Sequence, residues 1–307
     1  MAASLERPML HDGDLSEARP SELKRIANAF VQSKTAAFGA VIFVLFLLVA
    51  ILAPIIAPHD PAAQDLGRRL APPVGLGKGN ASFQYPLGND NLGRDILSRL
   101  LVGSRVSLAV GVSTVVLAGT VGSLIGAVAG FYRGFVDDVA MRIVDVWLAF
   151  PSLLLAIAFG AALGPGLFNL IIALSLSIWV IYCRVVRAEV LSIREQEFVL
   201  AARAMGASDA RLILRCILPN VLAPILVIST LQMGTVIISE ASLNFLGIGV
   251  QGSIPTWGGM LSDGREFMRQ AWWLSTFPGV AISIVVLSIN LVGDGLRDAL
   301  DPRLRGR

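Results

Sequence analysis

Six long apolar runs, each close to the length that crosses a lipid bilayer, constrain the fold of this 307-residue sequence more than any other feature. A hydrocarbon core about 30 Å thick is crossed by roughly 20 residues of α-helix. Backbone groups in hydrocarbon must be bonded within the segment, and none of the runs alternates like a barrel strand, so helices are expected. The predicted spans are residues 36–57, 106–131, 143–163, 166–183, 217–239 and 271–293. The predicted fold class is an all-α integral membrane protein with six transmembrane helices.

The composition agrees with a chain embedded in lipid. Hydrophobic residues make up 55% of the sequence, charged residues make up 15%, and the mean hydropathy is +0.71. These values lie outside the range of soluble domains. The net charge of +3 comes from basic residues, which in a membrane protein report topology. We therefore expect the lipid bilayer as a partner and no nucleic acid.

The basic residues also predict the orientation. Most of the 25 Lys and Arg residues fall on the side that carries both termini, which places both termini in the cytoplasm. The first 20 residues lack an apolar core and do not read as a cleaved signal peptide. The predicted regions are a cytoplasmic N-terminal tail (1–35), the first transmembrane helix (36–57), an external loop with an interfacial amphipathic helix (58–105), a five-helix core (106–297) with a cytoplasmic loop (194–219), and a cytoplasmic C-terminal tail (298–307).

The cytoplasmic loop, residues 194–219, predicts two short helices hinged at Gly206. Ser208 or Asp209 is placed to cap the second helix. Leu218 and Pro219 are expected to end the excursion. The first helix carries a low-volume apolar stripe at helical spacing, formed by Phe198, Ala201, Ala202 and Met205. Such a hairpin fits the groove of another protein, or it lies on the membrane surface with its arginines on lipid phosphates.

The external stretch LGNDNLGRDILSRLLVGSRVSL, residues 87–108, predicts a turn through Gly93 followed by an amphipathic helix. We expect this helix to lie flat at the outer interface, separate from the second span, with Asp95 and Arg99 paired at i,i+4. Its acidic residues do not have the spacing of a calcium loop.

The loop sequence AARAMGASDARLILRCILP, residues 201–219, resembles the Glu-Ala-Ala loop shared by permease subunits of bacterial ABC importers. The positions in register are Ala201, Ala202, Gly206, Leu218 and Pro219. Leu200 replaces the glutamate of the pattern and Cys216 replaces its isoleucine. The resemblance implies that residues 194–219, hereafter the coupling segment, dock a coupling helix into a cleft of a separate ATPase. The implied coupling residues also include Arg203 and Asp209.

No phosphate-binding G-x-x-x-x-G-K-[ST] motif occurs in the sequence, so we expect ATP and Mg to be bound by partner ATPases, with no cofactor and no metal in this chain. The two histidines, His11 and His59, stand apart from any cluster with metal-ligand spacing, which makes a membrane enzyme with catalytic residues an unfavoured alternative.

Three stretches are similar to the C-type subunit family of dipeptide and oligopeptide importers. They are residues 87–108, EASLNFLGIG at 240–249, and NLVGDGLRDALDPRLR at 290–305. The resemblance runs from about Lys34 to the C-terminus. It implies an importer-permease (type I) fold in the bacterial inner membrane, and a cargo of dipeptides, oligopeptides, glutathione or nickel.

The same resemblance implies the partners and the mechanism. They are a second, homologous permease in a heterodimer, two ATP-binding-cassette ATPase subunits and an extracytoplasmic substrate-binding protein. ATP-driven alternating access is the implied mechanism. An ion-coupled secondary transporter acting alone is a distant alternative. Such folds often carry paired broken helices around polar sites at mid-membrane, and the sequence does not show them, since its acids lie toward the ends of the spans.

Two acids close to the spans are candidate functional residues. Glu240, near Asn244, either lines the external end of a translocation path or makes a structural hydrogen bond or salt bridge. Asp145 is expected to pair with Arg142, one helical turn away.

Two small residues in the second span allow another helix to approach closely. Gly122 and Gly126 form a small-xxx-small pair. Ordinary packing within the bundle and a dedicated dimer face are both open.

Overall fold

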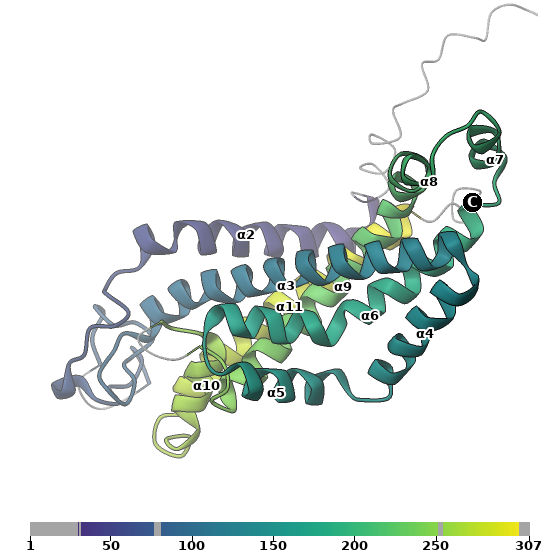
Figure 1. The fold of residues 1–307 in the computed structure, drawn as a ribbon. Helices are drawn as coiled ribbons and strands as arrows, with labels where there is room; N and C mark the ends of the chain where they lie inside the picture. Colours follow the sequence, from purple (N-terminus) through teal and green to yellow (C-terminus); the bar gives the residue numbers. More distant parts are fainter. Residues whose placement is uncertain (1–29, 31, 77–80, 251–253, 301–307) are drawn as a thin grey trace, which may run out of the picture.

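The computed structural model describes residues 30, 32–76, 81–250 and 254–300, and these residues are mainly helical (Figure 1). The predicted N-terminal tail up to residue 29 and the predicted C-terminal tail from residue 301 lie outside the described residues. The elements are α2 (Lys34–Ile56), η1 (Leu66–Arg68), α3 (Ile96–Tyr132), α4 (Gly134–Leu148), α5 (Ser152–Leu163), α6 (Leu167–Ile193), α7 (Glu197–Ala204), α8 (Asp209–Arg211), η2 (Leu212–Ile217), α9 (Leu218–Phe245), α10 (Trp257–Arg265) and α11 (Trp273–Leu300).

Five helical segments in the described residues are long and apolar enough to cross a membrane, namely α2, α3, α6, the segment Asp209–Phe245 and α11. The remaining predicted span, 143–163, which is the third along the sequence, is not a single helix. Its residues belong to α4 and α5, which meet at an angle of 90°. The chain therefore has six spans only when this bent pair counts as one.

The bend between α4 and α5 has a local cause. Pro151 has no N–H to donate, and its ring disfavours helical geometry at Phe150. Helix α4 therefore ends at Leu148, and the next helix starts after the proline. The apolar length of 143–163 masks this break, which explains why the sequence predicts one span.

The interfacial helix that the sequence predicts after Gly93, within residues 87–108, is not separate from the second span. Residues 96–132 form a single helix of 37 residues, which is about 55 Å long at 1.5 Å per residue. This length exceeds the hydrocarbon core, so the first turns extend beyond it. Ile96 is buried, and Gly103 allows the side chain of Trp257 to approach, which explains why the helix continues straight into the bundle.

Helices α3 and α6 pack closely because glycines line their contact. A Cβ on Gly122 would collide with the carbonyl oxygen of Trp179, and one on Gly126 would collide with that of Cys183. In this structure the small-xxx-small pair thus serves packing within the bundle, the first of the two expected roles.

The two ends of the bundle are different. Helices α7 and α8 project from one end, and η1 and α10 lie at the other end (Figure 1). If the termini are cytoplasmic, as the sequence predicts, the α7 end is the cytoplasmic end.

Candidate functional site

The coupling segment turns sharply after α7. Gly206 has φ +82°, in the left-handed region that favours glycine. Its N–H donates to the carbonyl of Arg203 at 2.9 Å, and the N–H of Ala207 donates to the carbonyl of Ala202 at 3.1 Å. This pair of bonds is a Schellman ending, which satisfies carbonyls that the last helical turn leaves free. The predicted break at Gly206 is confirmed, and Ser208 stands at the N-cap position of α8, although its side chain makes no capping hydrogen bond.

The side of the coupling segment that faces the bundle is apolar. Val199 of α7, Leu212 and Ile217 of η2, and Val221 of α9 are fully buried. They pack in one cluster with residues at the ends of α3 and α6, including Phe131 and Val190. Burial of this face fixes α7 against the bundle through the hydrophobic effect.

The opposite side of α7 is open. Among the expected coupling residues, Ala201, Arg203, Gly206 and Asp209 are exposed, and Ala202 is half-buried. Met205 keeps 82% of its accessible surface and Phe198 keeps 44%. Small and apolar side chains are therefore presented outward beside a guanidinium group, which is an arrangement that a protein groove can accommodate.

Two arginines connect α7 and its approach to the end of α3. The guanidinium of Arg203 lies 5.3 Å from the centre of the Phe131 ring, within the range of a cation–π contact. Arg194 lies 5.9 Å from the same ring and donates to the carbonyl of Phe131. Phe131 could not be predicted as a site residue, because nothing in its local sequence signals contact with residues more than 60 positions away.

The second arm of the coupling segment is continuous with a membrane span. Residues 209–245 form one helical segment that passes through the π-helical turn η2. Leu218 and Pro219 therefore lie in the first turn of α9 and do not end a separate hairpin, which corrects the sequence prediction.

Glu240 and Asn244 lie inside the chain. Their exposed fractions are 0% and 5%. Glu240 accepts hydrogen bonds from Asn244 Nδ2 at 2.6 Å and from Ser107 Oγ at 3.3 Å. Asn244 Oδ1 accepts from the N–H of Val250 at 2.7 Å. This geometry favours the structural alternative, in which the pair ties α9 to α3 and to the chain that follows α9.

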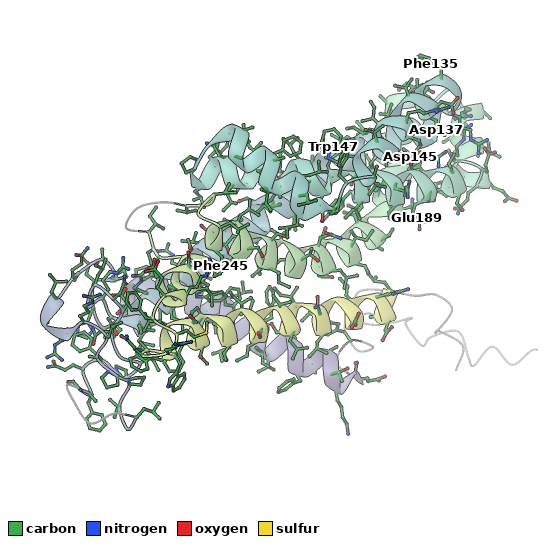
Figure 2. The ribbon with its side chains drawn as sticks, turned by 90° about the horizontal axis from the view of Figure 1, so that it is seen from below. Phe135, Asp137, Asp145, Trp147, Glu189 and Phe245 are labelled. Carbon is green, nitrogen blue, oxygen red and sulfur yellow. The ribbon has the colours of Figure 1, made fainter. Side chains whose placement is uncertain are left out.

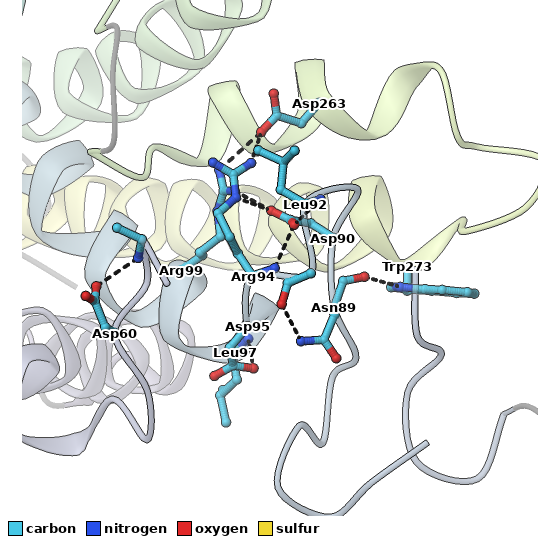
Figure 3. Close-up of polar contacts among 12 residues, drawn as sticks. Asp60, Asn89, Asp90, Leu92, Arg94, Asp95, Leu97, Arg99, Asp263 and Trp273 are labelled. Atoms are coloured by element: carbon cyan, nitrogen blue, oxygen red, sulfur yellow. Dashed lines mark hydrogen bonds and ion pairs between the residues drawn. The ribbon is translucent and has the colours of Figure 1, made fainter. Parts of the chain in front are cut away.

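Four charged side chains form a second cluster at the other end of the bundle (Figure 3). Asp90 accepts from Arg94 Nε at 2.6 Å and from Arg99. Asp263 of α10 accepts from Arg94 at 3.0 Å and from Arg99 at 3.1 Å. Asp95 is instead the N-cap of α3, so the predicted Asp95–Arg99 pair is wrong. The cluster joins the loop before α3 to α10.

Ion pairs also connect α4 with α6, and their acidic members, Asp137 and Asp145, are labelled in Figure 2. Arg187 forms a bidentate pair with Asp137, and Arg184 donates to Asp145 at 2.6 Å. Asp145 thus pairs across helices and not with Arg142, which is a further correction. These pairs support the extension of α6 to Ile193, ten residues beyond the predicted span.

Two family profiles match the chain. One is described as "binding-protein-dependent transport system inner membrane component" and covers residues 122–306. The other, described as "N-terminal TM domain of oligopeptide transport permease C", covers residues 21–73. A protein with this fold and these matches is an integral membrane permease component of an ABC importer. The chain belongs to the C-type permease subunit family of dipeptide and oligopeptide importers.

Similar proteins cover nearly the whole chain. It is 44% identical over 292 residues to the di/tripeptide transport system permease protein DppC of Pseudomonas aeruginosa, spanning 95% of this chain and 96% of the relative. It is also 44% identical over 277 residues to the glutathione transport system permease protein GsiD of Escherichia coli O1:K1, spanning 90% of this chain and 89% of the relative.

Among solved structures, the MetNI methionine ABC transporter in an inward-facing conformation is similar, with a TM-score of 0.53 and 19% sequence identity. The match covers 66% of this chain and 97% of that chain. This likeness shows the importer-permease fold.

Proposed function

We propose that this chain is one of two permease subunits of an importer that carries short peptides across the bacterial inner membrane. The relative with the di/tripeptide name supports a peptide cargo, because it matches 95% of the chain at 44% identity. Glutathione, named for a second relative, is itself a tripeptide.

The coupling segment is proposed to dock on an ATPase subunit. The observation that carries this proposal is the difference between the two sides of α7 and its C-cap, with Val199 fully buried against the bundle and the C-cap residue Met205 largely exposed. A helix that is packed against the bundle on one side and exposed on the other can pass a displacement by a bound ATPase on to the membrane helices. In the proposed assembly, a second permease completes the transport path, two ATPases bind at the cytoplasmic end with ATP and Mg, and a binding protein delivers cargo from outside.

The mechanism follows from what α7 contacts. A displacement of α7 reaches α3 through Arg203 and Phe131, and it reaches α9 through the continuous helical segment that starts at Asp209. ATP binding is proposed to favour one packing of these helices and hydrolysis the other, so that the path opens alternately to each side. With the α7 end in the cytoplasm, the start of α2 and the end of α11 are proposed to lie on the cytoplasmic side as well.

A crosslinking experiment tests the docking. Ala201→Cys in the assembled transporter is expected to crosslink to an ATPase subunit, because residue 201 lies on the exposed face of α7. The matched control is Ala161→Cys, at an exposed position on α5. Equal ATPase crosslinking at both positions, or crosslinking at neither, would contradict the docking proposal.

A transport experiment tests the cargo. Proteoliposomes that contain the assembled transporter and its binding protein are expected to take up radiolabelled di-alanine when ATP is supplied on the ATPase side. Unlabelled di-alanine should compete, and Ni²⁺ should not. Uptake of nickel without uptake of any short peptide would overturn the peptide assignment.

A further inference from the structure

An open cavity of about 580 Å³ lies between α6, α9 and α11, at the end of the bundle that carries α7, and it is accessible from the surface, since Asn220 and Arg297 in its lining are exposed and Glu189 is half-buried. This volume falls within the roughly 300–1,000 Å³ typical of small-molecule sites. Its polar lining residues are Glu189 of α6, Asn220 of α9 and Arg297 of α11. None of these three residues belongs to the coupling segment or to the hydrogen-bonded residues around Glu240.

The cavity holds one acid and one base that are not paired with each other. Glu189 and Arg297 both line it, and within the described part of the chain neither has an ion-pair or hydrogen-bond partner. Two arginines on the same helix as Glu189 are paired with other acids, Arg187 with Asp137 and Arg184 with Asp145, and so do not neutralise Glu189. A carboxylate and a guanidinium that face one cavity without partners are free to bind opposite charges of a ligand.

The wall beside Asn220 offers further hydrogen-bond acceptors. Asn220 Nδ2 donates to the carbonyl of Cys216 at 2.6 Å, which leaves its Oδ1 free to accept from a ligand. Pro224 lies inside α9 and has no N–H, so it cannot donate to the backbone carbonyl of Asn220 four residues earlier. Acceptors therefore come from Glu189 and Asn220, and guanidinium donors come from Arg297.

The rest of the lining is apolar and comes mainly from α9, including Ala223, Val227 and Leu231. Apolar walls bind side chains of different shapes with little discrimination, whereas the fixed charges recognise groups at the two ends of a ligand. The combination fits a small zwitterion with variable apolar substituents. A metal ion fits poorly, because no group of three His, Cys, Asp or Glu side chains suited to a metal occurs within the described ranges.

We propose that this cavity binds the free ends of a short peptide, with Glu189 and Asn220 at its ammonium group and Arg297 at its carboxylate. The proposal rests on the proposed function and assigns the last binding position of the cargo at the cytoplasmic end. It adds a cargo site within one permease chain, on helices that also carry the movement of the coupling segment. Release of peptide would follow when α9 shifts away from α6 or α11.

Binding to the membrane complex without the binding protein tests this proposal directly. The assembled permease–ATPase complex in nanodiscs is titrated with di-alanine and with N-acetyl-di-alanine amide, and binding is followed by saturation-transfer NMR. The wild type is expected to bind di-alanine and to bind the doubly blocked analogue at least tenfold more weakly. Glu189→Gln and Arg297→Gln are each expected to weaken di-alanine binding by about tenfold, the factor for one lost charged hydrogen bond.

Two further variants keep the test sharp. Asp298→Asn removes a charge next to Arg297 on the same helix but outside the cavity lining, and it should bind di-alanine like the wild type. The exchange Glu189→Arg with Arg297→Glu restores both charges in reversed positions, and it should recover most of the lost affinity because a zwitterion can bind in either direction. Recovery would exclude general damage to the fold.

The outcomes separate the two proposals. If wild-type proteoliposomes take up di-alanine and both single variants bind it as tightly as the wild type, the cavity assignment is overturned while the proposed function stands. Equal binding of the blocked and free peptides has the same meaning. If the wild type takes up no short peptide, the proposed function fails and the cargo assignment of the cavity fails with it.

Discussion

The guanidinium of Arg203 stacks over the ring of Phe131 at 5.3 Å, so the exposed helix α7 is joined to the last turn of α3. The guanidinium of Arg194 donates a hydrogen bond to the backbone carbonyl of Phe131. Because residues 209–245 form one helical segment, α9 is joined to the other arm of the coupling segment. A displacement of α7 can thus be transmitted to the bundle in two ways, to α3 through a side-chain contact and to α9 through continuous backbone.

Removal of the guanidinium should weaken the first route. Arg203→Met keeps an unbranched side chain but loses the cation–π contact, which is worth roughly 1 kcal/mol, so we expect about a fivefold fall in peptide transport per ATP hydrolysed. Transport and hydrolysis are measured together in proteoliposomes. Arg211→Met is the control, since Arg211 is also exposed and lies in the coupling segment. An equal fall in both variants would mean that the contact with Phe131 has no special part.

Substitution of Gly206 is expected to impair the proposed docking on the ATPase more than it impairs the folding of this chain. A Cβ there would meet no described atom within 4 Å, so Gly206→Val costs only the strain of a positive φ, about 1–2 kcal/mol. We expect loss of transport-stimulated ATP hydrolysis with the chain still inserted, because the added side chain would protrude into the groove of the ATPase in the proposed docking.

Gly164 is a matched control for this substitution. It has φ +81°, against +82° for Gly206, and equally open surroundings among the described atoms, but it lies in the turn between α5 and α6. Gly164→Val should lower the unfolding temperature by the same amount and leave stimulated hydrolysis intact. Similar hydrolysis rates in the two variants would argue against docking at Gly206.

The sequence predicts most spans and the position of the break at Gly206, because hydropathy over about 20 residues and a single glycine between helical stripes are local signals. It does not predict the 90° bend at Pro151, since the apolar run continues across the proline. It also separates residues 96–105 from the second span, because their charges suggest an interface, whereas the structure continues one helix through them.

Long-range pairs explain the remaining errors. Arg99 has an acid four residues earlier, and local spacing favours that partner, but the structure pairs it with Asp90 and with Asp263, which is 164 residues away. Likewise, Asp145 pairs with Arg184 and not with its neighbour in the helix. Charge spacing along one helix cannot report which charges meet when helices pack.

The two acids of the cluster of Asp90, Arg94, Arg99 and Asp263 should contribute unequally to the free energy of unfolding. Asp90 is buried between the two arginines, so Asp90→Asn leaves them with only the partly exposed carboxylate of Asp263 and one positive charge in excess, and it should lower the free energy of unfolding by about 3 kcal/mol. Asp263→Asn should cost less, because its side chain is 39% exposed. Thermal unfolding of the assembled transporter measures both. The exposed Asp60→Asn serves as control, and an equal effect there would contradict the role of burial.

Packing between α3 and α6 should tolerate no side chain at Gly126. Gly126→Ala places a Cβ into the carbonyl of Cys183, so the helices must separate and the assembled transporter should unfold at markedly lower temperature. Gly111→Ala, in the same helix, should be neutral or slightly stabilising, because the nearest atom to its Cβ lies at 3.6 Å and alanine favours the helix by about 1 kcal/mol. Equal effects of the two substitutions would contradict close packing at Gly126.

Glu240 offers a test between a structural role and contact with cargo. Glu240→Gln keeps an oxygen that can accept from Asn244 and an amide that can bond Ser107, so transport and stability should stay near wild type. Glu240→Ala leaves the buried Asn244 amide without that acceptor and opens a cavity, which should cost about 3 kcal/mol of stability. The KM for di-alanine should be unchanged in both variants, because the side chain is fully buried within the chain. If Glu240→Gln raises KM severalfold while thermal unfolding is unaffected, the carboxylate contacts the peptide during transport and the structural role is insufficient.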